Sequence, residues 1–325
     1  MNTRQMYLAK VATAFGLSLL FTLLLVFTAT AADREWPVSQ EDDPYRVEEF
    51  DISSPGELEV QTSGGHITVE ASENNRVRVE MYVRRNGRDL TPSDTDLDDF
   101  DIEISQTGNR VTAIADRRGR SRNWGRNNIS ISFVVFTPRA ISAELRTSGG
   151  HIAVTGLDGE QRLSTSGGHL KMNNLKGTVS ARTSGGHIEI RDFVGDMNAR
   201  TSGGHIEVEH SEGTIELHTS GGHISLNQLS GQVEATTSGG SIEADLTSIE
   251  PRGFGANLRT SGGHINVTVP EGIGLDLDLK GNRVSTKLEN FSGEIERDEV
   301  EGSINGGGPK LTARTSGGTV RISFR

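Results

Sequence analysis

A four-residue string, Thr-Ser-Gly-Gly, recurs along this chain at a fixed interval, and it limits the possible folds more than any other feature. Between Thr147 and Thr237 the string begins every 18 residues, and further copies begin at Thr62, Thr260 and Thr315. A second glycine series keeps the same step: Gly159, Gly177, Gly195, Gly213 and Gly231. Two glycine-marked turns per repeat leave segments of about five residues, a length that suits strands and is too short for helices.

Apolar and polar residues alternate on both sides of each turn. In one repeat, Val179 and Ala181 precede the turn and Ile188 and Ile190 follow it, while a polar residue such as Arg182 occupies each position between. Alternation with a period of two predicts strands that have one apolar face. We therefore expect these four apolar side chains to point inward in a coil that repeats over residues 143–245.

Stacking of such repeats predicts an all-β, single-stranded β-solenoid with rungs of about 18 residues. One unit cannot bury its own apolar face, whereas units hydrogen-bonded about 4.8 Å apart bury it against each other. The rung has two or three sides, and the pattern leaves this number and the handedness open. Two irregular rungs, near Lys280 and Gly302, would fill the 55-residue interval between Thr260 and Thr315.

The paired glycines of the repeat are predicted to form the structural turns. A tight turn repeated in register requires a positive φ at a fixed position, which glycine adopts without steric cost. This prediction covers Gly149, Gly150, Gly167, Gly168, Gly185, Gly186, Gly203, Gly204, Gly221, Gly222, Gly239 and Gly240.

The start of the chain has the pattern of an export signal. Arg4 and Lys10 precede an apolar run over residues 11–27, and small residues at 29–31 suit cleavage. We expect a signal peptide or an uncleaved anchor over residues 1–31, then a polar tether over 32–47. Residues 48–138 are predicted to form an irregular N-terminal β-subdomain that caps the solenoid of residues 139–325, whose last rungs are degenerate. The protein would then be periplasmic, on the cell surface or secreted, and would contact the membrane only through an uncleaved leader.

The composition excludes several classes of protein. The chain has no cysteine, so neither a disulfide framework nor a lipid-modified cysteine can form. Its formal net charge of -11 argues against nucleic acid and anionic membranes as partners. No Gly-x-Ser-x-Gly, nucleotide-binding loop or His-Glu-x-x-His is present, and carboxylates occupy positions that vary between repeats. We expect no catalytic residues and no cofactor.

Three segments resemble a bacterial family labelled putative adhesin: the repeated TSGGHI, VVFTPRAISAELRTSGG and LTARTSGGTVRIS. The resemblance covers residues 48–325. It implies an exported or membrane-tethered β-solenoid of the cell envelope, and it transfers no binding residues. A weaker resemblance is to the polymer-forming, bactofilin-type solenoids, which are shorter and cytoplasmic, whereas this chain has a leader.

A histidine follows the paired glycines in seven repeats: His66, His151, His169, His187, His205, His223 and His264. Side chains alternate between the two faces of a strand, and the residue after each histidine points inward, so the histidine is predicted by this parity to point outward. Neighbouring rings in the run His151, His169, His187, His205 and His223 are candidate zinc or copper ligands, with Glu189 or Glu207 on the same face. We favour a structural column whose nitrogens bond nearby hydroxyls such as that of Ser184. A pH-responsive surface is a third interpretation. The hydroxyls of the inward threonines Thr147–Thr237 are expected to hydrogen-bond along the stack and fix its register.

An arginine-rich segment is the candidate ligand site. It could bind an anionic glycan or phosphate, with a tryptophan stacking on a sugar ring. The candidate residues are Arg117, Arg118, Arg120, Arg122, Trp124 and Arg126. The alternative is a solvated loop paired with the acidic run at 94–103.

The sequence as a whole predicts a non-enzymatic envelope solenoid that presents a repetitive polar surface to an envelope glycan or a surface protein. One alternative is a membrane-tethered scaffold or regulatory protein that senses the state of the envelope. A polysaccharide-active β-helix enzyme is less favoured.

Overall fold

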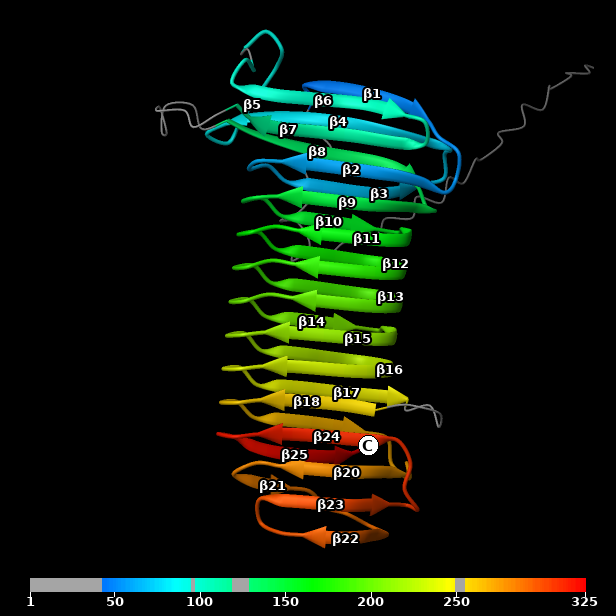
Figure 1. Cartoon of the computed structure of the whole chain (residues 1–325), viewed down its shortest axis with the longest axis vertical. Helices are drawn as coiled ribbons and strands as arrows, with labels where there is room; N and C mark the ends of the chain where they lie inside the picture. The colour runs from blue at the N-terminus through cyan, green and yellow to red at the C-terminus, as the bar shows by residue number, and fades with distance from the viewer. Residues whose placement is uncertain (1–42, 95–96, 119–128, 249–254) are drawn as a thin grey trace, which may run out of the picture. The chain divides into compact units, whose positions relative to one another are not determined.

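The computed structural model describes residues 43–94, 97–118, 129–248 and 255–325 (Figure 1). These residues form 25 strands and no helix, which confirms the all-β prediction. None of them forms a helix long and apolar enough to cross a membrane. The predicted signal peptide and most of the tether lie outside the described residues.

Parallel rungs form the middle of the stack. Their strands are β9 (Ile141–Thr147), β10 (Ile152–Thr155), β11 (Asp158–Ser164), β12 (Leu170–Arg182), β13 (Ile188–Arg200), β14 (Ile206–Glu209), β15 (Glu212–Thr219), β16 (Ile224–Thr237) and β17 (Ile242–Ser248). Strand β12 pairs with β13 so that Leu170 faces Ile188 and Ala181 faces Ala199, each pair being 18 residues apart in the sequence. Equivalent residues therefore form columns that run along the stack (Figure 1).

The first Thr-Ser-Gly-Gly repeat lies directly against the rung of Thr147. Its strands β2 (Gly56–Thr62) and β3 (Ile67–Ser72) pair in parallel with β9 and β10. The intervening chain folds on the other side of β2 and β3, first as the parallel partners β7 (Arg110–Arg117) and β8 (Ile129–Pro138). Antiparallel strands follow: β1 (Arg46–Asp51), β4 (Arg76–Arg85), β5 (Arg88–Leu90) and β6 (Phe100–Thr107).

The C-terminal repeat is inserted between two earlier segments. Strands β24 (Lys310–Thr315) and β25 (Thr319–Phe324) pair directly with β18 (Gly255–Thr260) and β19 (Ile265–Val269). Strands β20 (Leu275–Lys280) and β21 (Arg283–Ser285) lie on the far side of β24 and β25. Beyond β20 come the antiparallel β23 (Glu299–Ile304) and β22 (Phe291–Ile295). The irregular rung predicted near Lys280 is present as β20 and β21, but it lies beyond the Thr315 rung, which stacks directly on the Thr260 rung. The prediction for Gly302 is wrong, because that segment pairs in antiparallel fashion.

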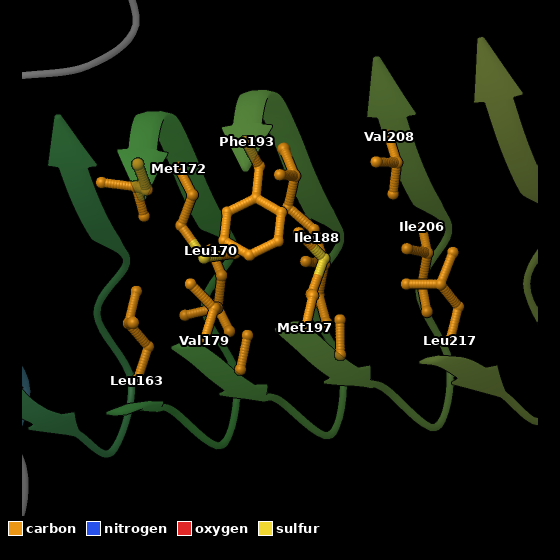
Figure 2. Close-up of a cluster of buried hydrophobic side chains, with 14 of the residues drawn as sticks. Leu163, Leu170, Met172, Val179, Ile188, Phe193, Met197, Ile206, Val208 and Leu217 are labelled. Atoms are coloured by element: carbon orange, nitrogen blue, oxygen red, sulfur yellow. The ribbon is translucent and has the colours of Figure 1, made fainter. Parts of the chain in front are cut away.

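The core consists of the inward columns. Val179, Ala181, Ile188 and Ile190 are buried, as the alternation predicted. Figure 2 shows inward side chains from successive rungs in contact, including the ring of Phe193. Phe193 has no exposed surface, and the register places Ser211, also buried, at the equivalent position of the next rung. A small side chain beside the largest one keeps the width of the interior constant.

The paired glycines serve a different purpose from the one predicted. None of them has φ in the left-handed region, whereas the second glycine series does, as at Gly177 (φ 115°) and Gly195 (φ 138°). The second glycine of each pair lies against the rung before it: a Cβ on Gly186 would stand 1.8 Å from the carbonyl oxygen of Gly168. A Cβ on Gly185 would meet nothing closer than 3.8 Å. Close approach of backbones therefore requires the second glycine, and the positive-φ prediction for the pair is wrong.

Candidate functional site

The histidines after the paired glycines form a stack of parallel rings. Successive ring centroids are 4.8–5.1 Å apart from His66 to His223, and the ring planes are within 16° of parallel. His187, His205, His223 and His264 are exposed, as parity predicted, and the rings nearer the N-terminal end are half-buried. This set is called the histidine column below.

Each ring of the histidine column accepts a hydrogen bond from the backbone of the next rung. The amide of His187 donates to Nδ1 of His169 at 2.8 Å, and the amide of His205 donates to Nδ1 of His187 at 2.8 Å. The series continues to Ser241, whose hydroxyl accepts from the amide of His264. Because an amide can only donate, each accepting Nδ1 is unprotonated and the neutral ring carries its proton on Nε2. The partner is thus a backbone amide and not the serine hydroxyl that we expected.

Burial and neighbouring charges favour the neutral form of four of these rings. Burial, with smaller contributions from His66 and His169, lowers the pKa of His151 to about 2. Burial also lowers the pKa of His66, His187 and His205 below the ordinary value of 6.5. A neutral ring is the form that the amide hydrogen bond requires, so the electrostatics and the geometry of the column agree.

The histidine column does not suit a metal ion. Among the described residues, no group of three or more histidine, aspartate, glutamate or cysteine side chains is placed to hold one. Binding through Nε2 would move the ring proton to Nδ1 and break the hydrogen bond from the next rung. The candidate carboxylate Glu189 lies 3.1 Å from the guanidinium of Arg191. The geometry therefore favours the structural interpretation of His151, His169, His187, His205 and His223.

The inward threonines bridge neighbouring rungs through glycine. The hydroxyl of Thr183 donates to the carbonyl oxygen of Gly168 at 2.8 Å and accepts from the amide of Gly186 at 3.3 Å. The same pair of bonds recurs in the other regular rungs, as at Thr165 and Thr201. The hydroxyls therefore hydrogen-bond from rung to rung, as predicted, and their acceptor is a glycine carbonyl of the neighbouring rung.

The arginine-rich candidate site is only partly within the described residues. Arg117 lies over the ring of Phe100, with 5.6 Å from its guanidinium carbon to the ring centroid. Arg118 forms an ion pair with Asp101, a residue of the acidic run, as the alternative interpretation expects. Arg120, Arg122, Trp124 and Arg126 lie outside the described residues, so the prediction of a glycan site there stays a prediction.

A second basic surface was not predicted from the sequence. The residue before each inward threonine faces outward, and the equivalent residues of neighbouring rungs are direct partners in the strand register. This arginine column consists, in spatial order, of Gln61, Arg146, Ser164, Arg182, Arg200, His218, Thr236, Arg259, Arg314 and Lys280. It contains no carboxylate, although the chain has a net charge of -11. Alternation within the repeat predicts that each of these residues faces outward. Only the register of the strands shows that they form one surface.

A groove lies along the C-terminal part of the arginine column. Its volume is about 590 Å³. Its lining includes the cations Arg259, Lys280 and Arg314, together with hydroxyls of the Thr-Ser-Gly-Gly turns such as Ser238 and Ser261. Guanidinium and hydroxyl groups side by side can bind carboxylate, sulfate or phosphate groups together with their neighbouring hydroxyls.

These features define a β-solenoid-like protein of stacked, hydrogen-bonded rungs. The chain belongs to the Toastrack DUF4097 family, whose model matches residues 47–323. No curated protein matches the sequence.

Several solved structures are similar to this chain. They include a putative adhesin from Bacteroides fragilis NCTC 9343, a putative lipid binding protein from Parabacteroides distasonis ATCC 8503 and a putative adhesin from Parabacteroides merdae ATCC 43184. Their sequence identities are 13%, 15% and 12%, and their TM-scores are 0.44, 0.45 and 0.45. The similarity covers 86% of this chain in each case and 96%, 96% and 95% of the three structures. Likeness at this level identifies no ligand for this chain, and two of the three names carry the putative-adhesin label of the family that the sequence resembles.

Proposed function

We propose that this protein is a non-enzymatic β-solenoid of the cell envelope whose repetitive polar surface binds an envelope glycan or a surface protein. The observation that supports binding is the in-register stacking of outward residues, such as Arg182 on Arg200. Identical groups then recur about every 4.8 Å along one line. A ligand with its own repeat can contact several of them at once, which raises its affinity over that of a single unit.

The finer architecture belongs to the same proposal. The coil of about 18 residues is the unit of the solenoid, and residues 48–138 close its N-terminal end. The antiparallel strands β1, β4 and β6 in that region support this, because they cover parallel rungs whose edges would otherwise be free to pair with another chain.

The non-enzymatic part of the proposal is supported by the engagement of outward carboxylates. Glu144 and Glu160 each form an ion pair with an arginine two residues along the same strand. A carboxylate that acts as a general acid or base must be free to exchange its proton with a substrate.

Location and binding are tested together in bacteria that express the full chain. Mass spectrometry of the exported protein should show the N-terminus after residue 31, and a glycan array should retain the mature protein on a polymer and not on its monomer. Retention of residues 1–31 would favour the tethered scaffold that senses the envelope. Recovery of the chain from the cytoplasm, or equal binding of monomer and polymer, would contradict the proposal.

A further inference from the structure

We propose that the arginine column binds an acidic polysaccharide, whose carboxylate or sulfate groups contact successive rungs. This inference rests on the proposed function and names the surface and the class of ligand. Three arginines carry it: Arg182, Arg200 and Arg259. All three are exposed.

These three arginines have no partner in the part of the chain that the structure describes, and the residue two positions earlier is neutral in each case. Other outward arginines are paired: Arg146, also in the column, with Glu144, Arg162 with Glu160, and Arg314 with Asp278 of the neighbouring strand. The corresponding residues before Arg182, Arg200 and Arg259 are Ser180, Asn198 and Asn257. No ion pair or side-chain hydrogen bond engages the three guanidinium groups within the described residues.

Stacking makes the unpaired guanidinium groups a site for a chain of anions. Arg182 and Arg200 are direct partners in neighbouring strands, about 4.8 Å apart, and His218 follows in the next rung. Two like charges at this distance repel each other, and an anion between them removes the repulsion. Each guanidinium presents a planar fork that matches a carboxylate or a sulfate.

Hydroxyl groups lie beside the cations. From Ser148 onward, the serine of each Thr-Ser-Gly-Gly turn is exposed two residues after the arginine column, as at Ser184 and Ser202. In the groove at the C-terminal part of the column, Ser261 lines the same space as the unpaired Arg259, whereas Arg314 beside Ser316 is already paired with Asp278. A sugar polymer needs both kinds of partner, because it carries hydroxyls between its acidic groups.

The surroundings of the column favour a polysaccharide over a nucleic acid. The column contains no phenylalanine, tyrosine or tryptophan on which bases could stack. Glu216 and Glu234 lie two residues before His218 and Thr236, so carboxylates flank the middle of the column. An acidic body repels a polymer of high charge density more strongly than one whose charges are interrupted by neutral hydroxyls.

The test compares two double variants of the full-length chain on immobilised heparin, polygalacturonate, single-stranded DNA and uncharged dextran at low salt. The first is Arg182→Ser with Arg200→Ser, which removes two cations from the column. The matched control is Arg110→Ser with Arg162→Ser, which removes two cations that lie outside the column and pair with Glu57 and Glu160. Heparin carries sulfates and carboxylates and polygalacturonate only carboxylates, so the two supports identify the acidic group.

The parent chain and the control should bind at least one acidic support, and the column variant should bind it about tenfold more weakly, with unchanged circular dichroism. If the serine variant unfolds, Arg182→Gln with Arg200→Gln replaces it. Equal weakening by both double variants, equal retention of single-stranded DNA, or no retention of the parent would overturn the inference. If the parent chain binds dextran and neither double variant changes that binding, the proposed function stands and the inference about the arginine column is overturned.

Discussion

Replacing each of the two adjacent glycines of one turn by alanine tests why glycine recurs there. The two explanations are close contact with the neighbouring rung and a backbone conformation that only glycine adopts easily. The variants are Gly186→Ala and Gly185→Ala, one methyl group each on neighbouring residues. Neither glycine has φ in the left-handed region, so strain in φ contributes to neither variant. Only the space in front of the added Cβ differs.

The distances give the expected magnitudes. The Cβ of Gly186→Ala would lie 1.8 Å from the oxygen and 2.4 Å from the carbon of the Gly168 carbonyl group, so the neighbouring rung must move by more than 1 Å. That shift strains the bonds from Thr183 to Gly168 and from His187 to His169, both 2.8 Å long. Two weakened hydrogen bonds and the overpacking together should cost about 2–6 kcal/mol of unfolding free energy. Gly185→Ala should change stability by less than about 1 kcal/mol.

Denaturant unfolding followed by far-ultraviolet circular dichroism measures both variants against the parent chain. Amide hydrogen exchange at Leu170 and Ile188 then locates the loss, because these amides bond across the affected rungs. Local opening of neighbouring rungs in the Gly186 variant is the expected result. Equal losses in both variants, or a larger loss for Gly185→Ala, would refute the close-approach explanation.

Three other outcomes follow from the columns. His187→Asn should protect the His205 amide from exchange better than His187→Ala, since an amide oxygen can replace Nδ1; equal exchange would contradict this. Ser211→Leu should cost about 1–3 kcal/mol by overpacking against Phe193, and adding Phe193→Leu should recover part of it; additive losses in denaturant would show that the two positions are independent. The unfolding free energy should fall as the pH drops from 7.5 to 5, measured by denaturant titration at each pH.

Alternation and repeat length made the strands and their inward faces predictable. Ile188 and Ala181 are buried because a period of two leaves a strand only one way to place its apolar residues against the next rung. The spatial order of the rungs was not predictable at either end. The repeat identifies similar segments, yet it does not show that most of the chain between Thr62 and Thr147 lies beyond the first Thr-Ser-Gly-Gly rung, nor that β20–β23 lie beyond the last one.

The side-chain contacts of the columns depend on details that parity does not contain. Parity predicts that Arg182 and Arg162 both face outward. It does not show that Arg162 forms an ion pair with Glu160 two positions earlier, whereas the corresponding neighbour of Arg182 is the neutral Ser180. The invariant second glycine of the turn likewise fits either positive φ or close contact, and only the distance of 1.8 Å at Gly186 distinguishes them. The sequence did not identify the ring nitrogen that accepts from each histidine amide, because the amide and the ring belong to different rungs.

The sign of the pH dependence follows from the protonation of the histidine column. Its folded pKa values at His66, His151, His187 and His205 lie below 6.5, so below that pH the unfolded chain binds protons that the folded column resists. The contribution of the histidine column to the unfolding free energy is therefore fully present above pH 6.5 and is lost as the pH falls. Asp278 adds nothing to this slope above pH 5, because its pKa lies below 3.8, and Glu207, whose pKa is raised by burial and by Glu209, acts in the opposite direction. Asparagine at 151, 187 and 205 keeps an acceptor without titrating and should flatten the curve. A parent curve that is flat between pH 7.5 and 5 would show that the rings accept protons without loss of their amide bonds.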